Sequence, residues 1–356
     1  MTQNDSLNRW STWREIHAQP DIWAAWAAEL DVDGLRGWLR TLDFEEIWFC
    51  GAGTSAYIGD ILVAGLEGQG PFRSVPSTDL VSRPQALLKG KRPLVVSFGR
   101  SGNSTESIGT LDALDALAPN APRLHITCNK DGALATRKGA GETKVILLPD
   151  ETHDAGFAMT SSFSTMLYTA LAMFDQACDV SSRLTELSYH LKNLLNVITV
   201  PDTHPDRIVF LGTGPLAFAA REAALKVMEL SAGEIPALWD STLGFRHGPK
   251  SFVMEGTDIV MFLSPESPAS LYEADLVAEL REQFPKCKIT TVGPEGDLDI
   301  SMPFGATWSA PVCIAVAQIL GVQWSDGMGL NVDNPFEGQG TLSRVVAGVK
   351  LYPVAS

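Results

Sequence analysis

Two acidic residues and a lysine stand at helical spacing in the second half of the chain. Glu222, Lys226 and Glu229 are separated by four and three residues, so in a helix they share one face. A carboxylate beside a cation can move a proton between neighbouring carbon atoms. An ordinary solvated Glu–Lys pair is the alternative, and the sequence leaves both open.

A histidine follows these residues in a constrained, cation-rich loop. His247 lies in Leu243-Gly-Phe-Arg-His-Gly-Pro-Lys250, a setting that suits acid/base work near neutral pH. A hydrogen-bonded structural histidine is the alternative. Together with a carboxylate base, such a residue can open a pyranose ring and transfer a proton between C2 and C1 of a sugar. This chemistry needs no metal or redox cofactor, so we expect neither.

The first half carries a loop that suits an anion. Phe98-Gly-Arg-Ser-Gly-Asn-Ser-Thr-Glu106 follows a β-branched stretch and precedes a helical one. Backbone N–H groups at a helix N-terminus, with small hydroxyls, bind phosphate. Helix capping is the alternative, but it explains only one of the hydroxyls. We therefore expect a phosphate site formed by Arg100, Ser101, Gly102, Asn103 and Ser104.

The second half lacks this loop. The corresponding segment, Ser264-Pro-Glu-Ser-Pro268, has two prolines and a carboxylate where N–H groups would be needed. The sequence therefore predicts one phosphate site per chain.

The elements that must position these residues occur twice. In each half an apolar strand enters a Gly-rich turn, at 47–56 and 207–217, and a strand with a Ser-bearing loop follows, at 93–104 and 258–267. Later elements also match: strands at 123–128 and 288–292, short strands at 145–149 and 300–303, and helices at 162–177 and 311–323. This alternation predicts an α/β protein of two tandem, doubly wound parallel-sheet domains.

We expect four parts: an N-terminal helical segment (1–40), a first domain with the phosphate loop (41–190), a second domain with the acid/base residues (191–340) and a C-terminal tail (341–356). Trp23, Trp26 and Leu30 share one helical face in the first part. This pattern predicts an amphipathic helix that packs on the body or on a second subunit.

A dinucleotide fingerprint is also present. Gly51-Ala-Gly-Thr-Ser-Ala56 and Gly212-Thr-Gly-Pro-Leu-Ala217 both fit G-x-G-x-x-A. That site also needs an acid at the end of the second strand. Asp79 lies in a Pro-broken stretch, and the second copy offers Pro215 and no obvious acid. We therefore favour a packing role, in which glycine lets each first helix approach its sheet.

Composition limits the partners. The 356 residues carry a net charge of −15, which argues against nucleic acid and anionic membranes. Apolar stretches are interrupted well short of the roughly 18 residues of a membrane span, and the N-terminus has no secretion signal. The five cysteines, Cys50, Cys128, Cys178, Cys287 and Cys313, show no metal spacing. We expect a cytoplasmic protein with reduced core thiols.

Several of these strings resemble a known family. Gly53 to Ser55, Ser101 to Ser104, Ala224 to Leu230 and Arg246 to Pro249 are similar to the sugar isomerase (SIS) domain, two copies of which form the isomerase part of glucosamine-6-phosphate synthase. Longer strings resemble the AgaS-type galactosamine-6-phosphate deaminase/isomerases: 51–60, 97–104, 151–162, 333–336 and 343–349.

The resemblance implies roles for individual residues. Gly53, Thr54, Ser55, Ser101 and Ser104 would line the phosphate and sugar. Glu229 would move the C2 proton with Lys226 nearby. His247 would open the ring, in its own chain or in the site of a partner, since such enzymes are dimers or higher homo-oligomers with shared sites.

Two further residues are expected at the site. Arg344 stands where the synthase has a C-terminal lysine near the sugar, but arginine stays charged and cannot supply a neutral amine. His153 lies in a loop after a strand end, where α/β proteins bind ligands. We include both among the expected substrate contacts.

The resemblance implies conversion of galactosamine-6-phosphate to tagatose-6-phosphate and ammonia. The alternatives are plain aldose–ketose isomerisation, deamination of glucosamine-6-phosphate, and a phosphosugar-binding regulator without catalysis. A regulator would lack Glu229 or His247 or carry a DNA-binding segment, and both residues are present. The sequence does not distinguish gluco from galacto configuration, or an amine from a hydroxyl at C2.

Overall fold

A computed structural model describes residues 6–175, 179–199, 201, 203–340, 342, 345–346 and 348–354. The chain divides into two compact units, each assembled from separate segments. Unit 1 comprises Met1–Ala24, Ala155–Thr160 and Ser182–Thr341; unit 2 comprises Ala25–Asp154, Ser161–Ser181 and Leu342–Ser356.

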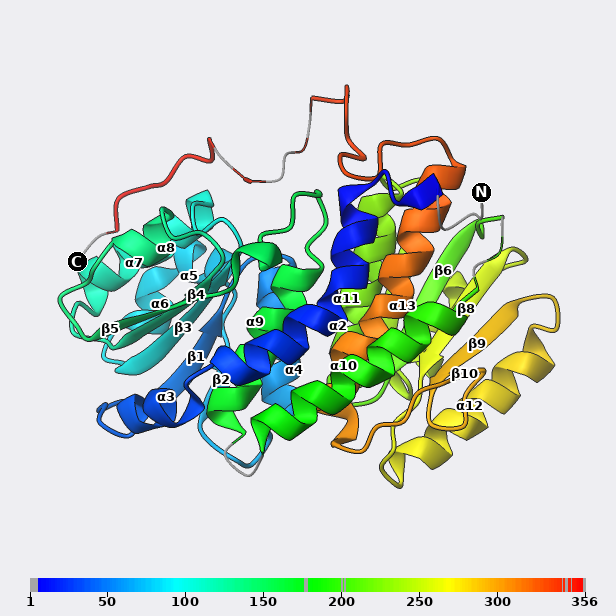
Figure 1. The fold of residues 1–356 in the computed structure, drawn as a ribbon, viewed down its shortest axis with the longest axis horizontal. Helices are drawn as coiled ribbons and strands as arrows, with labels where there is room; N and C mark the ends of the chain where they lie inside the picture. The colour runs from blue at the N-terminus through cyan, green and yellow to red at the C-terminus, as the bar shows by residue number, and fades with distance from the viewer. Residues whose placement is uncertain are drawn as a thin grey trace. The chain divides into compact units, whose positions relative to one another are not determined.

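Unit 2 contains a five-stranded parallel sheet in the order β2-β1-β3-β4-β5 (Figure 1). Its strands are β1 (Glu46–Cys50), β2 (Phe72–Ser74), β3 (Pro93–Gly99), β4 (Arg123–Thr127) and β5 (Thr143–Leu147). β3 and β4 are buried along their whole length, as expected for central strands covered on both faces.

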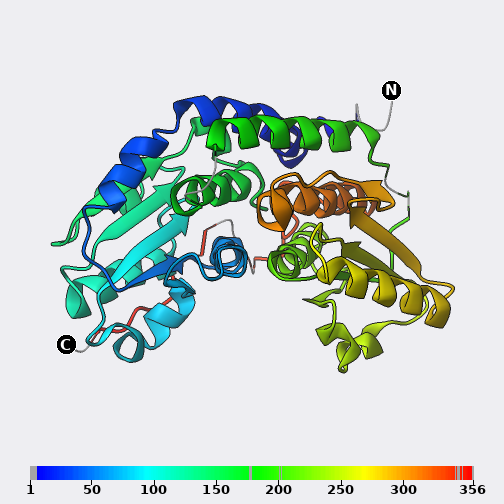
Figure 2. The same cartoon turned by 90° about the horizontal axis from the view of Figure 1, so that it is seen from below.

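Helices cover both faces of this sheet (Figure 2). One face packs on α4 (Thr54–Gly65) and α9 (Ser161–Phe174), and the other on α5 (Ser77–Ser82), α6 (Pro84–Leu88) and α7 (Thr105–Leu117). The remaining elements are α3 (Val32–Leu39), α8 (Ala133–Thr136) and a 3-10 turn, η1 (Asp150–Thr152).

Unit 1 repeats the arrangement. Its parallel sheet has the order β7-β6-β8-β9-β10, which is the order of the first sheet when strands are counted from the start of each half. The strands are β6 (Arg207–Gly212), β7 (Ala237–Ser241), β8 (Thr257–Phe262), β9 (Lys288–Gly293) and β10 (Leu298–Asp299). The predicted fold class, two doubly wound α/β domains in tandem, is confirmed.

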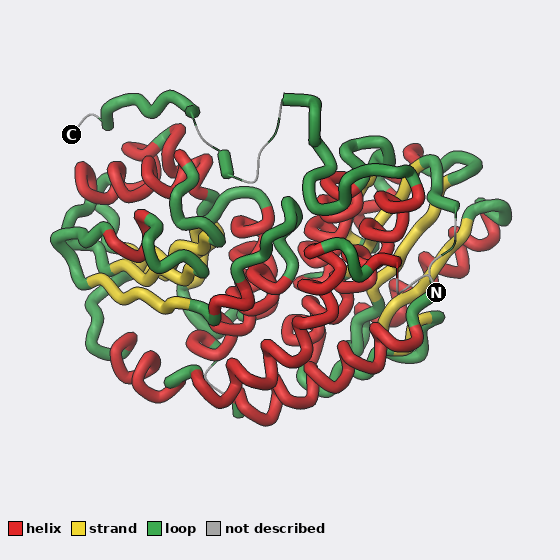
Figure 3. The backbone as a smooth tube through the Cα atoms, turned by 45° about the horizontal axis from the view of Figure 1, so that its top comes forward, coloured by secondary structure: helices red, strands yellow, loops and turns green. Residues whose placement is uncertain are grey.

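The helices of unit 1 also lie on both faces of its sheet (Figure 3). α11 (Pro215–Leu230) packs along α13 (Gly305–Gly327). The other face packs on α12 (Ala269–Gln283) and on two 3-10 turns, η2 (Gly244–Arg246) and η3 (Pro249–Phe252). α2 (Ser11–Glu29) and α10 (Val180–Val197) complete the elements.

The glycine-rich turns match in backbone conformation. Gly53 precedes α4 with φ 55° and ψ −131°, and Gly214 precedes α11 with φ 56° and ψ −126°, a region that favours glycine. A Cβ on Gly51 or Gly212 would lie 2.5 Å from a backbone oxygen of the following helix. The predicted packing role of these glycines is therefore confirmed in both halves.

The compact units do not follow the expected linear bounds. α2 contributes its first part to unit 1 and its last residues to unit 2, and the tail from Leu342 belongs to unit 2. Trp13 and Trp23 are buried, as the expected packing of this helix requires. Trp26 donates to the hydroxyl of Thr169 at 2.9 Å. The expected boundary between the two sequence repeats, near residue 190, stays a prediction.

Three strand assignments need correction. No strand forms at 300–303, because β10 ends at Asp299 and the carbonyl of Met302 accepts the Gly305 N–H at the start of α13. Sequence analysis also missed β2 and β7. Both are short, and both lack the continuous apolar run of the central strands.

One helix contradicts the statement that apolar stretches are too short to span a membrane. α13 is long and apolar enough by length and composition, with a mean hydropathy of 1.5 over 18 residues. However, 83% of that window is buried inside the protein, and Gln318 within it accepts a hydrogen bond from Gln19. α13 is therefore the core helix of unit 1.

Four of the cysteines lie in the described residues and are free thiols, as predicted. Burial raises the pKa of Cys50, Cys128 and Cys313 to about 12 in each case. Cys287 is only half-buried, and Cys178 lies outside the described residues.

A buried histidine stands on β4. His125 has no exposed surface, and neither ring nitrogen has a hydrogen-bond partner among the described residues. Burial, together with the charge of Arg123, lowers the pKa of His125 to about 4 from an ordinary 6.5. The folded protein therefore keeps this ring neutral at pH values where the unfolded chain binds a proton.

Because only the unfolded chain gains this proton, the free energy of unfolding should fall as the pH falls from 6.5 to 4. The contribution of His125 is about 3 kcal/mol. We expect His125→Leu to lose less stability over this window than wild type, as measured by urea unfolding at several pH values. His204→Asn, at an exposed histidine, is the matched control. An unchanged pH dependence in His125→Leu would contradict a buried neutral histidine.

Candidate active site

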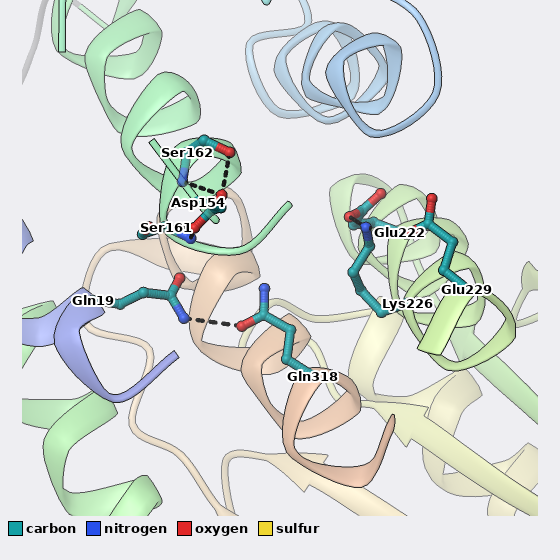
Figure 4. Close-up of polar contacts among 8 residues, drawn as sticks. All are labelled: Gln19, Asp154, Ser161, Ser162, Glu222, Lys226, Glu229 and Gln318. Atoms are coloured by element: carbon teal, nitrogen blue, oxygen red, sulfur yellow. Dashed lines mark hydrogen bonds and ion pairs between the residues drawn. The ribbon is translucent and has the colours of Figure 1, made fainter. Parts of the chain in front are cut away.

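The three charged residues of α11 form a buried ionic triad (Figure 4). The Lys226 ammonium lies 3.3 Å from Oε1 of Glu222 and donates to Oε2 of Glu229 at 2.6 Å. Glu222 and Lys226 have no exposed surface, whereas the side chain of Glu229 is 23% exposed. The alternative of a solvated Glu–Lys pair is therefore wrong.

Burial and charge act in opposite directions on Lys226. Burial lowers the pKa of Lys226, but the attraction of Glu222 and Glu229 outweighs it and the pKa is raised. The ammonium is therefore charged at neutral pH. Since it is fully buried, Lys226 holds the two carboxylates in place, and Glu229 is the member of the triad that solvent reaches.

His247 lies in an anchored loop of unit 1. It follows η2 and is exposed. On either side of it, Arg246 donates to Glu279 of α12 at 2.8 Å and Lys250 also pairs with Glu279. The cations expected around His247 thus bind the loop to α12 and leave the imidazole at the surface.

The predicted phosphate loop connects β3 to α7 in unit 2. Several of its residues already make hydrogen bonds to neighbouring segments. Ser104 is the N-cap of α7 and accepts the Ser107 N–H at 3.1 Å. Gly102 has a φ of +63°, and its carbonyl accepts the Leu134 N–H. Asn103 accepts the Ala133 N–H at 2.8 Å. The loop is therefore rigid before any anion arrives.

The C-terminal tail reaches this loop. The carbonyl of Val346 accepts the N–H of Thr105 at 3.2 Å and its hydroxyl at 3.3 Å. The N–H and the hydroxyl of Thr105, in the first turn of α7, are thus already bonded. Arg344, the expected tail contact, lies outside the described residues.

The other expected contacts of unit 2 differ in exposure. Thr54 and Ser55 are buried in the first turn of α4, and Arg100 is buried at the end of β3. His153 is exposed after η1. The expected site residues therefore form two groups: the triad and His247 in unit 1, and the loop with these four residues in unit 2.

Sequence analysis missed the acids that support this architecture. Asp154 has no exposed surface, and its two oxygens accept the N–H groups of Ser161 and Ser162, each at 3.0 Å (Figure 4). It therefore caps α9 across the loop 155–160. The sequence signal for this cap is an aspartate that precedes, by a six-residue loop, a Ser-Ser pair at the start of an apolar helix.

A second acid organises unit 1. The carboxylate of Asp333 accepts the N–H groups of Ser11 and Thr12, each at 2.8 Å, at the start of α2. The carbonyl of Asp333 accepts the Phe157 N–H at 2.9 Å, and the rings of Phe157 and Phe336 are 5.1 Å apart. The segments 151–162 and 333–336, which both resemble AgaS sequences, thus pack against each other.

In the second half, a carboxylate occupies the position that corresponds to the phosphate loop. Glu266 follows β8 and accepts the hydroxyl of Ser264 and, at 3.3 Å, the N–H of Ala306 in the first turn of α13. The protein thus supplies its own anion at this helix N-terminus. This arrangement supports one phosphate site per chain.

The dinucleotide alternative also needs a correction. β7 ends at Asp240–Ser241, so the second copy does have an acid at that place. However, Asp240 accepts the N–H of Ser241 at 2.6 Å and packs against Gly244, within its own turn. Within the described part of the chain, no group of three or more His, Cys, Asp or Glu residues is arranged to hold a metal.

Comparison with known proteins decides the family. The chain is 38% identical over 371 aligned residues to the D-galactosamine-6-phosphate deaminase AgaS of Escherichia coli, and the alignment covers 96% of each protein. Identity to the AgaS protein of Shewanella sp. (strain ANA-3) is 36%, over 96% of this chain and 92% of that one. The chain belongs to the AgaS family of SIS proteins.

Solved structures agree with the AgaS assignment. The tagatose-6-phosphate ketose/aldose isomerase from Escherichia coli superimposes with a TM-score of 0.86 at 33% identity, covering 96% of this chain and 97% of that one. The glucosamine-6-phosphate deaminase of Thermotoga maritima, at 24% identity and a TM-score of 0.75 over 94% and 99% of the chains, shares the fold. No protein-family model matches the chain.

Removal of the lysine from this AgaS triad should be costly, because it leaves Glu222 buried without its cation. We expect Lys226→Met to lower the free energy of unfolding by about 3 kcal/mol or more. Lys286→Met, which breaks an exposed pair with Glu255, should cost at most about 1 kcal/mol. Urea denaturation of both variants measures this, and equal small losses would show that the triad is not buried.

Proposed function

We propose that the chain is an amino-sugar-phosphate deaminase and isomerase that converts galactosamine-6-phosphate to tagatose-6-phosphate and ammonia. The single observation that carries the chemistry is the triad, in which the partly exposed Glu229 lies beside a charged, buried lysine. The names of the AgaS relatives, which match almost the whole chain, support the choice of substrate.

The proposed reaction uses two groups of the chain. His247 transfers the proton that opens the pyranose ring and exposes the aldehyde at C1. Glu229 removes the proton from C2 and returns it to C1, while a second proton passes from the C2 nitrogen to O1; the product is an imine at C2 with a hydroxyl at C1. Water then adds to this carbon and ammonia departs, so the products are the ketose phosphate and ammonia. Lys226 acts as a positioning residue, because its burial keeps it from the substrate.

We propose that the phosphate binds at the loop after β3. The overall charge of −15 repels a phosphate, so attraction must come from local N–H groups and hydroxyls. Ser101 is the best candidate among the hydroxyls. In the described structure its oxygen accepts the Asn103 N–H at 3.3 Å, which leaves the hydroxyl proton to donate. Thr54, Ser55, Arg100 and His153 would complete the sugar site.

The assembly and location are also part of this proposal. We propose a homodimer or larger homo-oligomer in the cytoplasm, with His247 serving its own site or that of a partner. The free thiols among the described residues support a reducing compartment. The exposure of His247 supports contact with another chain.

A second candidate is ketose–aldose isomerisation without an amine. The name of the solved Escherichia coli relative favours it. The same proton transfer between C2 and C1 would then occur on a hydroxyl, and no water would be consumed.

The deciding experiment measures ammonia release from galactosamine-6-phosphate and, in parallel, from glucosamine-6-phosphate, while tagatose-6-phosphate is followed. We expect ammonia and tagatose-6-phosphate from the galacto substrate at a higher kcat/KM than from the gluco substrate. Interconversion of tagatose-6-phosphate with its aldose, without ammonia from either amine, would replace the first proposal with the second.

The role of Glu229 can be tested by substitution. We expect Glu229→Gln to reduce kcat at least 100-fold, because an amide cannot accept the C2 proton, while phosphosugar binding measured by calorimetry persists. Glu282→Gln, at an exposed carboxylate of α12, is the control and should keep the wild-type rate. A near-normal rate in Glu229→Gln would remove this residue from the mechanism.

The phosphate loop needs a test that separates binding from stability. Ser104→Ala should destabilise the protein by about 1 kcal/mol, since it removes an N-cap. Ser101→Ala should leave stability nearly unchanged, and the double variant should bind any 6-phosphosugar at least tenfold more weakly. Ser82→Ala, at an exposed serine near the end of α5, is the control. Unchanged affinity in the double variant would place the phosphate elsewhere.

A further inference from the structure

Unit 1 contains a cavity that the proposed reaction does not use. It encloses about 310 Å³ and is lined by the first residues of β6, β8 and β9 and by the last turns of α13. Ile208 and Asp258 are second in their strands, and Lys288 is first in β9. The volume lies at the lower end of the roughly 300–1,000 Å³ of small-molecule sites, so a ligand here would be small.

Most of the wall is aliphatic. Val316 and Leu320 come from successive turns of α13, and Ile208 and Val260 come from the sheet. Lys288 is exposed, so the cavity opens to solvent beside the start of β9. These walls suit a branched hydrocarbon group.

Three polar groups line the same cavity, and none of their side chains makes a hydrogen bond to another described residue. Trp324 is 3% exposed, and its indole N–H has no acceptor among the described residues. Lys288 and Asp258 make no hydrogen bond or ion pair to another described residue, although they are aligned on neighbouring strands. A buried N–H without an acceptor is costly, so the indole marks a position for a ligand oxygen.

The remaining acid of the wall is already engaged. Asp297 accepts the N–H and the hydroxyl of Thr291, each at 2.8 Å. At Asp258, burial raises the pKa and the charge of Lys288 opposes this rise. A cation or N–H donor beside Asp258 would therefore be favourable, whereas a second anion there would not.

We propose that this cavity binds a small zwitterion with a branched aliphatic side chain, an apolar α-amino acid. Its ammonium pairs with Asp258, its carboxylate accepts from the Trp324 indole and from Lys288, and its side chain fills the space between Val260, Val316 and Leu320. One ligand binds per chain. The site is separate from the sugar-phosphate chemistry and does not depend on it.

Calorimetric titration of the full-length protein tests the proposal with three matched probes. L-leucine carries both charges, 3-methylbutylamine lacks the carboxylate, and 4-methylpentanoate lacks the ammonium. We expect L-leucine to saturate one site per chain, and each of the other two to bind at least tenfold more weakly. No leucine binding up to 10 mM, or equal binding of either analogue, overturns the proposal.

Two variants locate the site. Trp324→Phe keeps the ring and removes the donor, and Asp258→Asn removes the charge; each should weaken leucine binding at least tenfold. Asp275→Asn, at an exposed acid of α12, should bind leucine as wild type does. Melting temperatures of all three confirm that they fold. If folded Trp324→Phe and Asp258→Asn bind leucine normally, the ligand lies elsewhere and the assignment of this cavity is wrong.

Discussion

The burial of Lys226 between two carboxylates is the constraint on which the catalytic half of this protein depends. Three ionised groups on one helix face are stable in a dry interior only if each has a partner at close range. α13 packs closely along α11, since a Cβ on Gly321 would lie 2.7 Å from Cδ1 of Leu230 and 3.4 Å from the Lys226 carbonyl. Of the three side chains, that of Glu229 alone keeps an exposed surface.

Much of this fold could be predicted because its signals are local. A strand, a glycine turn and a helix N-terminus are encoded within ten residues at Gly51–Gly53 and again at Gly212–Gly214. The repetition itself reveals the tandem sheets. The three charges of α11 were also found, since helical spacing alone places them on one face. Their burial was not, because it depends on α13, about a hundred residues further along the chain.

The features that were missed are those that join distant segments. Asp333 caps the start of α2 from more than 300 residues away, and no local pattern encodes such a pair. Asp154 caps α9 across a six-residue loop, which hides it from searches for adjacent caps. The edge strands β2 and β7 have one sheet neighbour each, so their residues need not be continuously apolar. The contact of Val346 with Thr105 was missed for the same reason as Asp333, because it joins segments that are far apart in the sequence.

Glu266 shows how two copies of one fold can come to differ. In the first half, the turn after β3 keeps a hydroxyl proton free beside the start of α7. In the second half, Glu266 stands in the corresponding turn after β8 and bonds to Ser264 and to Ala306 at the start of α13. A side chain tethered in the same molecule is present at a very high effective concentration. The turn after β8 thus already holds a carboxylate of the same chain. A duplicated domain can in this way exchange an external anion for an internal one, while other residues of the same copy, here Glu229 and His247, keep the proposed chemistry.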